Sequence, residues 1–330
     1  MKVEKKQIDA LNLELELTVQ AADYAEIERK KLAECRRKAD FKGFRKGNVP
    51  ASLVKKLYGE QILVESVNEV VGTSLDSYIN DEKLHILGEP LNSENQPEIQ
   101  WQDGSDFTFL FDVALSPEFS VEATKDDVVS KYSVTLTAKD KEPMIENLKK
   151  FYADKEETRT DEEIEEEVTE RMKADLDQES EWRLSKDIRD YFVDKAAFEL
   201  PEAFLKRWLF VANRGKYTQE DIEKEFPGFV QDFKWQMVRG KFALKYGIKI
   251  EQQDITDAAQ EFVSYQYAMY GMNDIPAEIL KDAVNNVLSD SKQVDRLAEQ
   301  VEEKKVMSAI KENMTVKSQR IGLAKFRELK

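Results

Sequence analysis

The sequence predicts an α+β protein with a small N-terminal α/β domain and an extended, mostly α-helical C-terminal domain with arms. Apolar and polar residues alternate at 11–19 and 107–115, which is the period of a half-buried strand. Charged residues make up 35% of the 330 residues, whereas only 12 are Gly and 8 are Pro. This composition favours long, solvated helices over the glycine-rich loops of a nucleotide-binding α/β enzyme.

Local signals place the elements of the N-terminal domain. Asp23 and Glu26 have the spacing of a capping box, so a helix begins there and runs to about Lys38. Pro50 begins a second helix, and Gly59 can end it. The predicted elements are, in order, a strand at 11–19, helices at about 23–38, 50–59 and 61–80, and strands at 84–90 and 107–115.

The remainder of the chain is predicted to be mainly helical. The predicted domains are 1–119, a connector at 120–160 that contains a short strand at 132–137, and a helical domain at 161–330. A Pro-Gly pair at 227–228 is expected to separate two helices, the second of which Gly247 ends. The last 55 residues are predicted to be helical with a basic tail. Further helix starts are predicted at Asp161, Pro201, Asp254 and Pro276.

Few residues are available for catalysis or metal binding. The chain has one histidine, His85, and one cysteine, Cys35, so no disulfide and no cysteine-based zinc site can form within it. We therefore expect no catalytic residues, no metal and no cofactor. The longest uncharged run, 262–273, is shorter than the ~20 residues that span a bilayer. The acidic N-terminal residues do not resemble a signal peptide, so we expect a cytoplasmic protein with no membrane partner.

Two segments carry opposite charge. Residues 29–56 hold eleven basic and two acidic residues, a net charge of +9, although the whole chain has −16. Such a block is typical of a contact with a polyanion or an acidic protein surface, and the alternative is a solvated basic helix face. Residues 154–181 hold fourteen acidic and four basic residues. Their narrow apolar stripe predicts a helix that is exposed on most sides.

Large apolar residues gather in the C-terminal half. Seventeen of the 32 aromatic residues lie within 191–270. Most should form ordinary helix–helix contacts, but thin helical arms cannot bury all of them, and some should line an exposed surface for other polypeptides. The candidate residues for this surface are Phe229, Phe233, Met237, Tyr265, Met269 and Met272.

The segment at 41–50 has the pattern of an exposed tip. Gly43 and Gly47 allow tight turns on both sides of Phe44, Arg45 and Lys46. An aromatic ring flanked by cations suits a partner with an apolar pocket bordered by acidic groups or phosphates.

This segment resembles the ribosome-binding signature of the trigger factor family, the ribosome-associated chaperones of bacteria. The signature is G-F-R-x-G-x-x-P, and the residues that match it are Gly43, Phe44, Arg45, Gly47 and Pro50. The stretches at 51–60 and 86–90, and LPEAFLKRWL at 200–209, are also similar to the family.

The resemblance implies an ATP-independent chaperone that holds nascent or unfolded polypeptides and assists their folding. Its tip would dock on the large ribosomal subunit at the tunnel exit, on a ribosomal protein and nearby rRNA, and its helical arms would hold nascent chains. It also implies self-association as a homodimer. The implied ribosome-binding residues are those of the signature together with Arg36, Arg37, Lys42 and Lys46.

The sequence departs from the family in its middle. Family members usually carry a prolyl isomerase domain of about a hundred residues, but only about 80 residues separate Phe119 from Leu200, and many of these belong to the acidic helix. We therefore expect no enzymatic activity. Two alternatives remain. One is a peptidyl-prolyl isomerase, which only the usual activity of the family supports. The other is a general RNA-binding protein that uses the basic block, and its affinity for RNA would fall steeply as the salt concentration rises.

Overall fold

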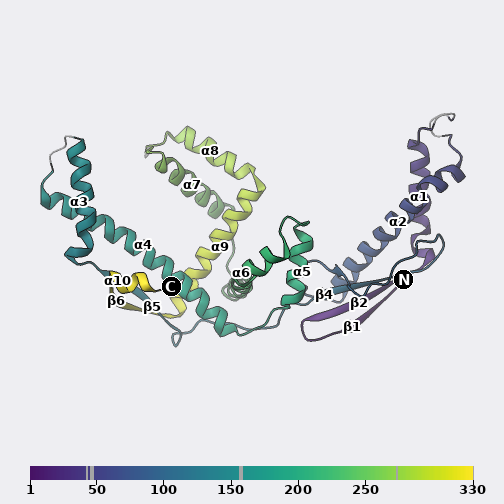
Figure 1. The fold of residues 1–330 in the computed structure, drawn as a ribbon, viewed down its shortest axis with the longest axis horizontal. Helices are drawn as coiled ribbons and strands as arrows, with labels where there is room; N and C mark the ends of the chain where they lie inside the picture. Colours follow the sequence, from purple (N-terminus) through teal and green to yellow (C-terminus); the bar gives the residue numbers. More distant parts are fainter. Residues whose placement is uncertain (42–43, 45–47, 156–158, 273, 330) are drawn as a thin grey trace. The chain divides into compact units, whose positions relative to one another are not determined.

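The chain folds into two compact units, which are described separately. The computed structural model describes residues 1–41, 44, 48–155, 159–272 and 274–329. The first unit comprises 1–118 and 198–228, and the second comprises 119–197 and 229–330. The predicted α+β class is confirmed, with a small N-terminal sheet and mostly helices after it (Figure 1). The return of 198–228 to the first unit is not part of the predicted domain division.

A four-stranded antiparallel sheet forms one layer of the first unit. Its order is β1 (Lys2–Gln7), β2 (Asn12–Val19), β4 (Phe107–Ala114) and β3 (Leu91–Asn92). The register places Leu15 opposite Phe111 and Leu17 opposite Phe109. Because side chains alternate between the faces of a strand, this register gathers the apolar residues of both strands on one face.

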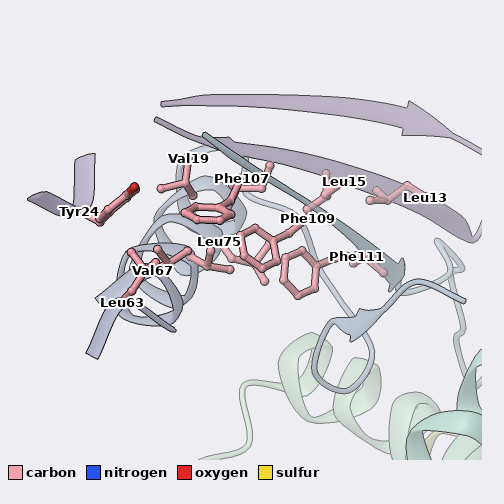
Figure 2. Packing of buried hydrophobic residues seen from close by; sticks show 13 residues of the cluster. Leu13, Leu15, Val19, Tyr24, Leu63, Val67, Leu75, Phe107, Phe109 and Phe111 are labelled. Carbon is pink, nitrogen blue, oxygen red and sulfur yellow. The ribbon is translucent and has the colours of Figure 1, made fainter. Parts of the chain in front are cut away.

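Helix α2, which spans Ala51–Asp81, covers this apolar face. Leu63, Val67 and Leu75 of α2 are buried in the same cluster as the strand residues. Figure 2 shows these side chains pointing toward Phe109 and its neighbours on the sheet. Burial of a side chain of this size stabilises the fold by roughly 1.5–3 kcal/mol. Helix and sheet therefore share one core in the first unit.

Helix α1 spans Ala21–Lys38 and begins with a capping box. The backbone N–H of Gln20 donates to the Asp23 carboxylate at 2.9 Å. Gln20 is thus the N-cap and Asp23 the third helical residue. The predicted pairing of Asp23 with Glu26 was one turn too late.

Three predicted features of the first unit were wrong. Helix α2 is continuous, so Gly59 does not end it and 61–80 is not a separate helix. Gly59 does not adopt the left-handed conformation that ends many helices, and the residues Val54 and Ile62 on either side of it are both buried. Instead of a strand at 84–90, Ile86 makes an isolated bridge and β3 follows later.

Strand β1 was not predicted from the sequence. Its residues, KVEKKQ, are almost all exposed, and it lies at the edge of the sheet. Charged side chains, lysine above all, are common on edge strands because they prevent pairing with other chains. The same charges remove the apolar alternation by which strands are recognised.

Helix α5 (Glu202–Ala212) attaches to the β3 side of the sheet. The Arg207 guanidinium donates to the Asp112 carboxylate at 2.8 Å and to the Asn92 carbonyl at 3.1 Å. These bonds explain why a segment so late in the sequence belongs to the first unit.

The contact between Gly88 and Trp208 joins two of the stretches that resemble the trigger factor family, 86–90 and 200–209. Gly88 has φ +71°, and a Cβ atom there would lie 2.8 Å from the indole Nε1 of Trp208. Glycine is therefore required at this position for both its backbone conformation and its lack of a side chain.

The second unit combines one strand pair with long helices. Its elements are, in order, β5 (Val128–Thr135), α3 (Ala138–Asp154), α4 (Asp161–Ala196), the later part of α6 (Gln219–Tyr246), α7 (Gln252–Met269), α8 (Ala277–Ser289), α9 (Ser291–Asn313), β6 (Thr315–Gly322) and α10 (Leu323–Glu328). β5 and β6 pair in parallel although 187 residues separate their first residues. Leu176 of α4 packs beside this pair with Leu323 and Phe326.

The carboxylate of Asp127 anchors the start of β5. It accepts hydrogen bonds from Lys195 Nζ at 2.6 and 2.8 Å, from the Tyr191 hydroxyl at 2.7 Å and from the Thr124 N–H at 2.7 Å. The Asp127 carbonyl accepts from the N–H of Thr315, the first residue of β6. Burial alone would raise the pKa of Asp127, which is 4% exposed, but these hydrogen bonds lower it to about 2.

Helix α4 contains the predicted acidic helix. Its carboxylates are largely exposed, whereas Ile164, Val168 and Leu176 form a narrow buried stripe. Farther along α4, Phe192 is fully buried and its ring meets that of Phe242 of α6 edge to face, with centroids 5.1 Å apart. The acidic part of α4 is therefore solvated, and its C-terminal part belongs to a core.

Two further predictions were wrong in the later part of the chain. The Pro227-Gly228 pair does not break the chain into two helices, because α6 is continuous through it. Both residues are exposed, so water can satisfy the carbonyl that the proline leaves unpaired. The tail is not entirely helical, since residues 315–322 form β6. Most residues of β6 are exposed, so its sequence lacks apolar alternation.

We expect Gly88→Ala to destabilise the first unit by roughly 2 kcal/mol or more, because strain at positive φ adds to the clash with Trp208. Gly104→Ala is the matched control, since Gly104 has φ +75° and nothing lies within 4 Å of its Cβ position. Urea-induced unfolding followed by tryptophan fluorescence measures both. Equal losses in the two variants would show that the Trp208 contact contributes nothing.

We expect Asp127→Asn to destabilise the second unit by about 2 kcal/mol at pH 7, because the folded-state pKa lies well below the ordinary value. A lowered carboxyl pKa stabilises the fold above its unfolded value of 3.8, and this contribution is lost as pH falls toward about 2. The difference from wild type should therefore shrink over that window in urea titrations. Asp126→Asn, at an exposed neighbour, should change little. A pH-independent difference would contradict the assignment.

Candidate functional site

The predicted docking residues cluster around the segment that joins α1 to α2. Arg36, Arg37, Phe44 and Pro50 lie within the described residues. The other predicted docking residues lie outside them and stay predictions; these are Lys42, Gly43, Arg45, Lys46 and Gly47.

Phe44 lies at the surface between two anchored points. Its ring is 41% exposed, and its N–H donates to the Phe41 carbonyl at 2.9 Å. The Phe41 ring lies 6.2 Å from that of Tyr58 on α2. On the other side of the segment Val49 is fully buried, and its carbonyl accepts from Arg36 Nε at 2.8 Å. Phe44 thus lies between these anchors with much of its surface open to solvent.

Pro50 occupies the N-cap position of α2, directly before Ala51. Its fixed φ suits the entry to a helix. At the other side of the segment, Arg36 and Arg37 belong to the last turn of α1, where the helix dipole favours cations. The described ends of both helices therefore flank the predicted tip in the sequence.

Only some of the basic side chains on this hairpin are neutralised locally. Four lysines form ion pairs: Lys30–Glu26, Lys31–Glu69 and Lys38–Glu34 have N···O distances of 2.9, 2.8 and 2.7 Å, and Lys55 pairs with Asp103. Among the residues that the structure describes, Arg29, Arg37 and Lys56 make no ion pair. These cations remain available to an anionic partner.

The predicted apolar binding residues fall into two sets. Phe229, Phe233 and Met237 lie four residues apart along α6 and are half-buried. The rings of Phe229 and Phe233 stack with centroids 5.5 Å apart. These three side chains form a stripe along α6, and each of them is partly buried within the fold.

The second set lies at the end of α7 and just beyond it. Tyr265 is 66% exposed, Met269 is 71% exposed, and Met272 is also exposed. The neighbouring Tyr270 is exposed as well. Such a group of large apolar side chains at the surface is typical of a site that binds other chains.

Sequence reasoning missed several exposed apolar residues of the second unit. Leu244 at the end of α6, Ile279 of α8 and Trp182 of α4 are all exposed. Trp182 stands between Glu181 and Arg183, and Leu244 and Ile279 adjoin apolar residues that are less exposed, so no local pattern marks them. Only the helix geometry places these side chains on the outer faces.

A groove of about 540 Å³ lies between α7 and α9. Phe262, Tyr265 and Val301 supply its apolar lining. Lys305 Nζ of α9 and the Asp254 carboxylate of α7 lie 2.5 Å apart and join the two helices beside it. The hydrogen bond from Lys305 lowers the pKa of Asp254. The groove gives α7 a concave surface next to its exposed end.

The described residues show no group of three or more His, Cys, Asp and Glu side chains arranged to hold a metal ion. His85 is exposed and uses its backbone carbonyl to accept from the Ser116 N–H. Cys35 is a free thiol on α1. In the part of the chain that is described, no helix is long and apolar enough to cross a membrane.

Two family models match the chain. One, described as "Bacterial trigger factor protein (TF)", matches residues 1–148, and the other, "Probable trigger factor, C-terminal domain", matches residues 180–330.

Similar curated proteins are the trigger factors of Francisella tularensis subsp. novicida, with 34% identity over 151 residues, and of subsp. holarctica (strain OSU18), with 32% over 153 residues. Each alignment covers 46% of this chain and 33% or 34% of the relative. The aligned part thus spans about a third of these curated relatives.

A solved structure is similar over nearly its whole length. It is described as "Promiscuous Substrate Recognition in Folding and Assembly Activities of the Trigger Factor Chaperone". The similarity covers 94% of this chain and 99% of that chain, with a TM-score of 0.57 and 13% sequence identity. At this identity the similarity is one of fold.

Proposed function

Because this chain belongs to the trigger factor family, we propose that it is an ATP-independent, ribosome-associated chaperone of the cytoplasm. It holds nascent or unfolded polypeptides and assists their folding. The observation that carries the proposal is the exposed apolar end of α7 in a chain that also has a basic hairpin with an exposed Phe44. A homodimer off the ribosome belongs to the same proposal, since exposed apolar side chains of two copies can bury one another.

The α1–α2 hairpin is the proposed ribosome contact. The Phe44 ring supplies an apolar anchor, and Arg37 and Lys56, which make no ion pair with a described residue, supply charge for acidic groups or phosphates. The partner is the large ribosomal subunit at the tunnel exit, where a ribosomal protein and nearby rRNA offer both kinds of group. Buried anchors control the dissociation rate, whereas long-range charge controls encounter.

Clients are held by apolar contact without ATP. Tyr265, Met269 and Met272 offer rings and flexible thioethers, which adapt to side chains of varied shape. Charged residues such as Glu261 and Lys304 lie beside this surface and keep it solvated. Binding of this kind is weak and sequence-tolerant, so that a client can be released to fold.

We also propose that the chain has no prolyl isomerase activity. Residues 149–179 lie between the two family-model matches. In the described part of 119–197, the structure has one strand, β5, and the helices α3 and α4, whereas an isomerase barrel needs several strands around an aromatic pocket. Turnover of a proline-containing peptide above background would overturn this part of the proposal.

We expect the triple change Phe44→Ala, Arg45→Ala and Lys46→Ala to weaken binding to purified ribosomes by roughly tenfold or more, since it removes an aromatic anchor and two cations. Co-sedimentation at several protein concentrations measures the affinity, and circular dichroism checks folding.

The matched control is Phe151→Ala, Lys155→Ala and Arg159→Ala. It removes the same three residue types from an exposed part of the second unit. This variant should pellet with ribosomes as the wild type does. Equal weakening in both triples would indicate a generic RNA contact, and no binding by any of the proteins would refute ribosome docking.

We expect Tyr265→Ser with Met269→Ser to lower holding activity, so that several-fold more protein is needed to suppress aggregation of a denatured client. Light scattering during client dilution measures it. Stability should stay within about 0.5 kcal/mol of wild type, because both side chains are largely exposed. Val211→Ser with Tyr217→Ser, at exposed positions of the first unit, is the control. Unchanged suppression in the α7 variant would exclude this surface as the client site.

A further inference from the structure

The parallel pair β5–β6 has one covered edge and one open edge. At the outer edge of β5, the Ser180 hydroxyl of α4 donates a hydrogen bond to the Tyr132 carbonyl. At the outer edge of β6, no strand of the described residues pairs with it, and residues 317–320 are all exposed. Figure 1 shows β6 beside β5. Within the second unit, an additional strand could therefore join the pair only at β6.

The outer edge of β6 presents backbone donors and acceptors in alternation. The N–H of Thr315 donates to the Asp127 carbonyl at 2.8 Å, so Thr315 directs its backbone groups toward β5. Because successive residues of a strand direct these groups to opposite edges, Val316, Ser318 and Arg320 direct theirs away from β5. No described residue forms a hydrogen bond with these outward groups. They recur every second residue, about 6.6 Å apart, which is also the spacing in another extended polypeptide.

Cations border this edge on both faces of the strand. Lys317 and Arg320 are three positions apart, so their side chains leave β6 on opposite faces. Neither side chain forms an ion pair with a described residue. Residues 315–330 hold five basic residues and one acidic residue, a net charge of +4 in a chain whose net charge is −16. The edge is therefore suited to an acidic partner.

An extended polypeptide matches this edge better than two other partners do. A second copy of β6 would bring cations against cations, which weakens strand pairing. The phosphates of a nucleic acid would pair with the cations, but phosphates only accept hydrogen bonds and leave the outward carbonyls without donors. An added strand supplies both an N–H for each carbonyl and a carbonyl for each N–H. It also enlarges a sheet that, with two strands, is at the lower limit of stability.

We propose that the outer edge of β6 binds an unfolded polypeptide segment as a third strand and favours segments in which two carboxylates lie three residues apart. Residues with this spacing leave their strand on opposite faces, so one carboxylate meets Lys317 and the other meets Arg320. The proposal rests on the proposed function as a holder of unfolded polypeptides. It adds a class of client segment and a binding site that is distinct from the end of α7.

The first test locates the bound segment by amide hydrogen exchange, resolved by residue with NMR. The probe is a synthetic peptide of about ten Thr and Val residues that includes two Glu residues three positions apart. At saturating peptide, exchange of the Val316, Ser318 and Arg320 amides should slow by about tenfold or more, because each gains an acceptor. The Lys317 and Gln319 amides, which face β5, should change little.

The outcomes separate this proposal from the proposed function. If wild type suppresses client aggregation but the peptide protects none of these amides, the β6 site is refuted and the chaperone proposal stands. If wild type neither binds the peptide nor suppresses aggregation, both proposals fail. Stronger protection of the same amides by a single-stranded RNA oligonucleotide, or by self-association of the protein, would overturn the choice of partner.

The second test changes the edge itself. Ser318→Pro removes an outward N–H and places a ring in the path of an added strand, but it spares the hydrogen bonds to β5. It should weaken binding of the fluorescein-labelled peptide about tenfold in fluorescence anisotropy, whereas Ser318→Ala, which keeps the N–H, should bind as wild type does. Thermal melting checks that both variants are folded. Equal affinities of Ser318→Pro and wild type would refute strand addition.

The third test uses charge and does not depend on the proline variant. Lys317→Glu with Arg320→Glu should weaken binding of the Glu peptide several-fold and strengthen binding of the corresponding Lys peptide. The matched control, Lys292→Glu with Arg296→Glu, reverses the same two residue types at exposed positions of α9 and should leave both affinities unchanged. If wild type bound neither peptide, the cations would serve only to keep the edge unpaired, and the proposal would fail. Equal binding of the two peptides to wild type would refute the preference for carboxylates.

Discussion

The carboxylate of Asp127 lies where the start of β5, the C-terminal part of α4 and the start of β6 meet. Its side chain binds Lys195 and Tyr191 of α4, and its own carbonyl accepts from Thr315 of β6. The carbonyl bond to Thr315 lies directly before the first pair of the parallel strands, Val128 and Thr315, so Asp127 holds the start of the pair in place. The burial of Leu176 and Phe326 beside the strands depends on that pairing. One residue thus connects three distant segments, through its carboxylate on one side and its carbonyl on the other.

The two proposed binding surfaces belong to different units. The basic hairpin lies in the first unit, and the exposed end of α7 lies in the second. The +9 block at 29–56 stands against a net charge of −16 for the whole chain. Strong net charge keeps a protein with exposed apolar side chains from associating indiscriminately. The acidic remainder also confines attraction for polyanions to the hairpin.

Patterns that depend on neighbours in the sequence were predicted well. The alternation in β2 and β4 corresponds to a sheet face that α2 buries. Strands β1 and β6 were missed because their pairing partners, rather than their own apolar residues, define them. Gly59 and Pro227 were wrongly predicted to interrupt helices, since α2 continues through Gly59 and α6 continues through Pro227.

Side chains whose role comes from tertiary contacts were not predictable. In sequence, Asp127 is an ordinary acidic residue in a charged segment. Asp127 stabilises the fold because Lys195, which lies 68 positions later in the sequence, forms an ion pair with its carboxylate. The position of Phe44, in contrast, follows from the adjacent glycines and cations, which is why a local motif was enough to mark it.

Because β5 precedes β6 by so many residues, the two strands can pair only after β6 has been synthesised. At a synthesis rate of about 5–20 residues per second, 187 residues take roughly 10–40 s, so β5 leaves the ribosome long before its partner exists. During that interval its hydrogen-bonding groups are open to any extended chain nearby. A protein of this architecture therefore passes through a stage of its own biogenesis in which one strand edge stays unpaired.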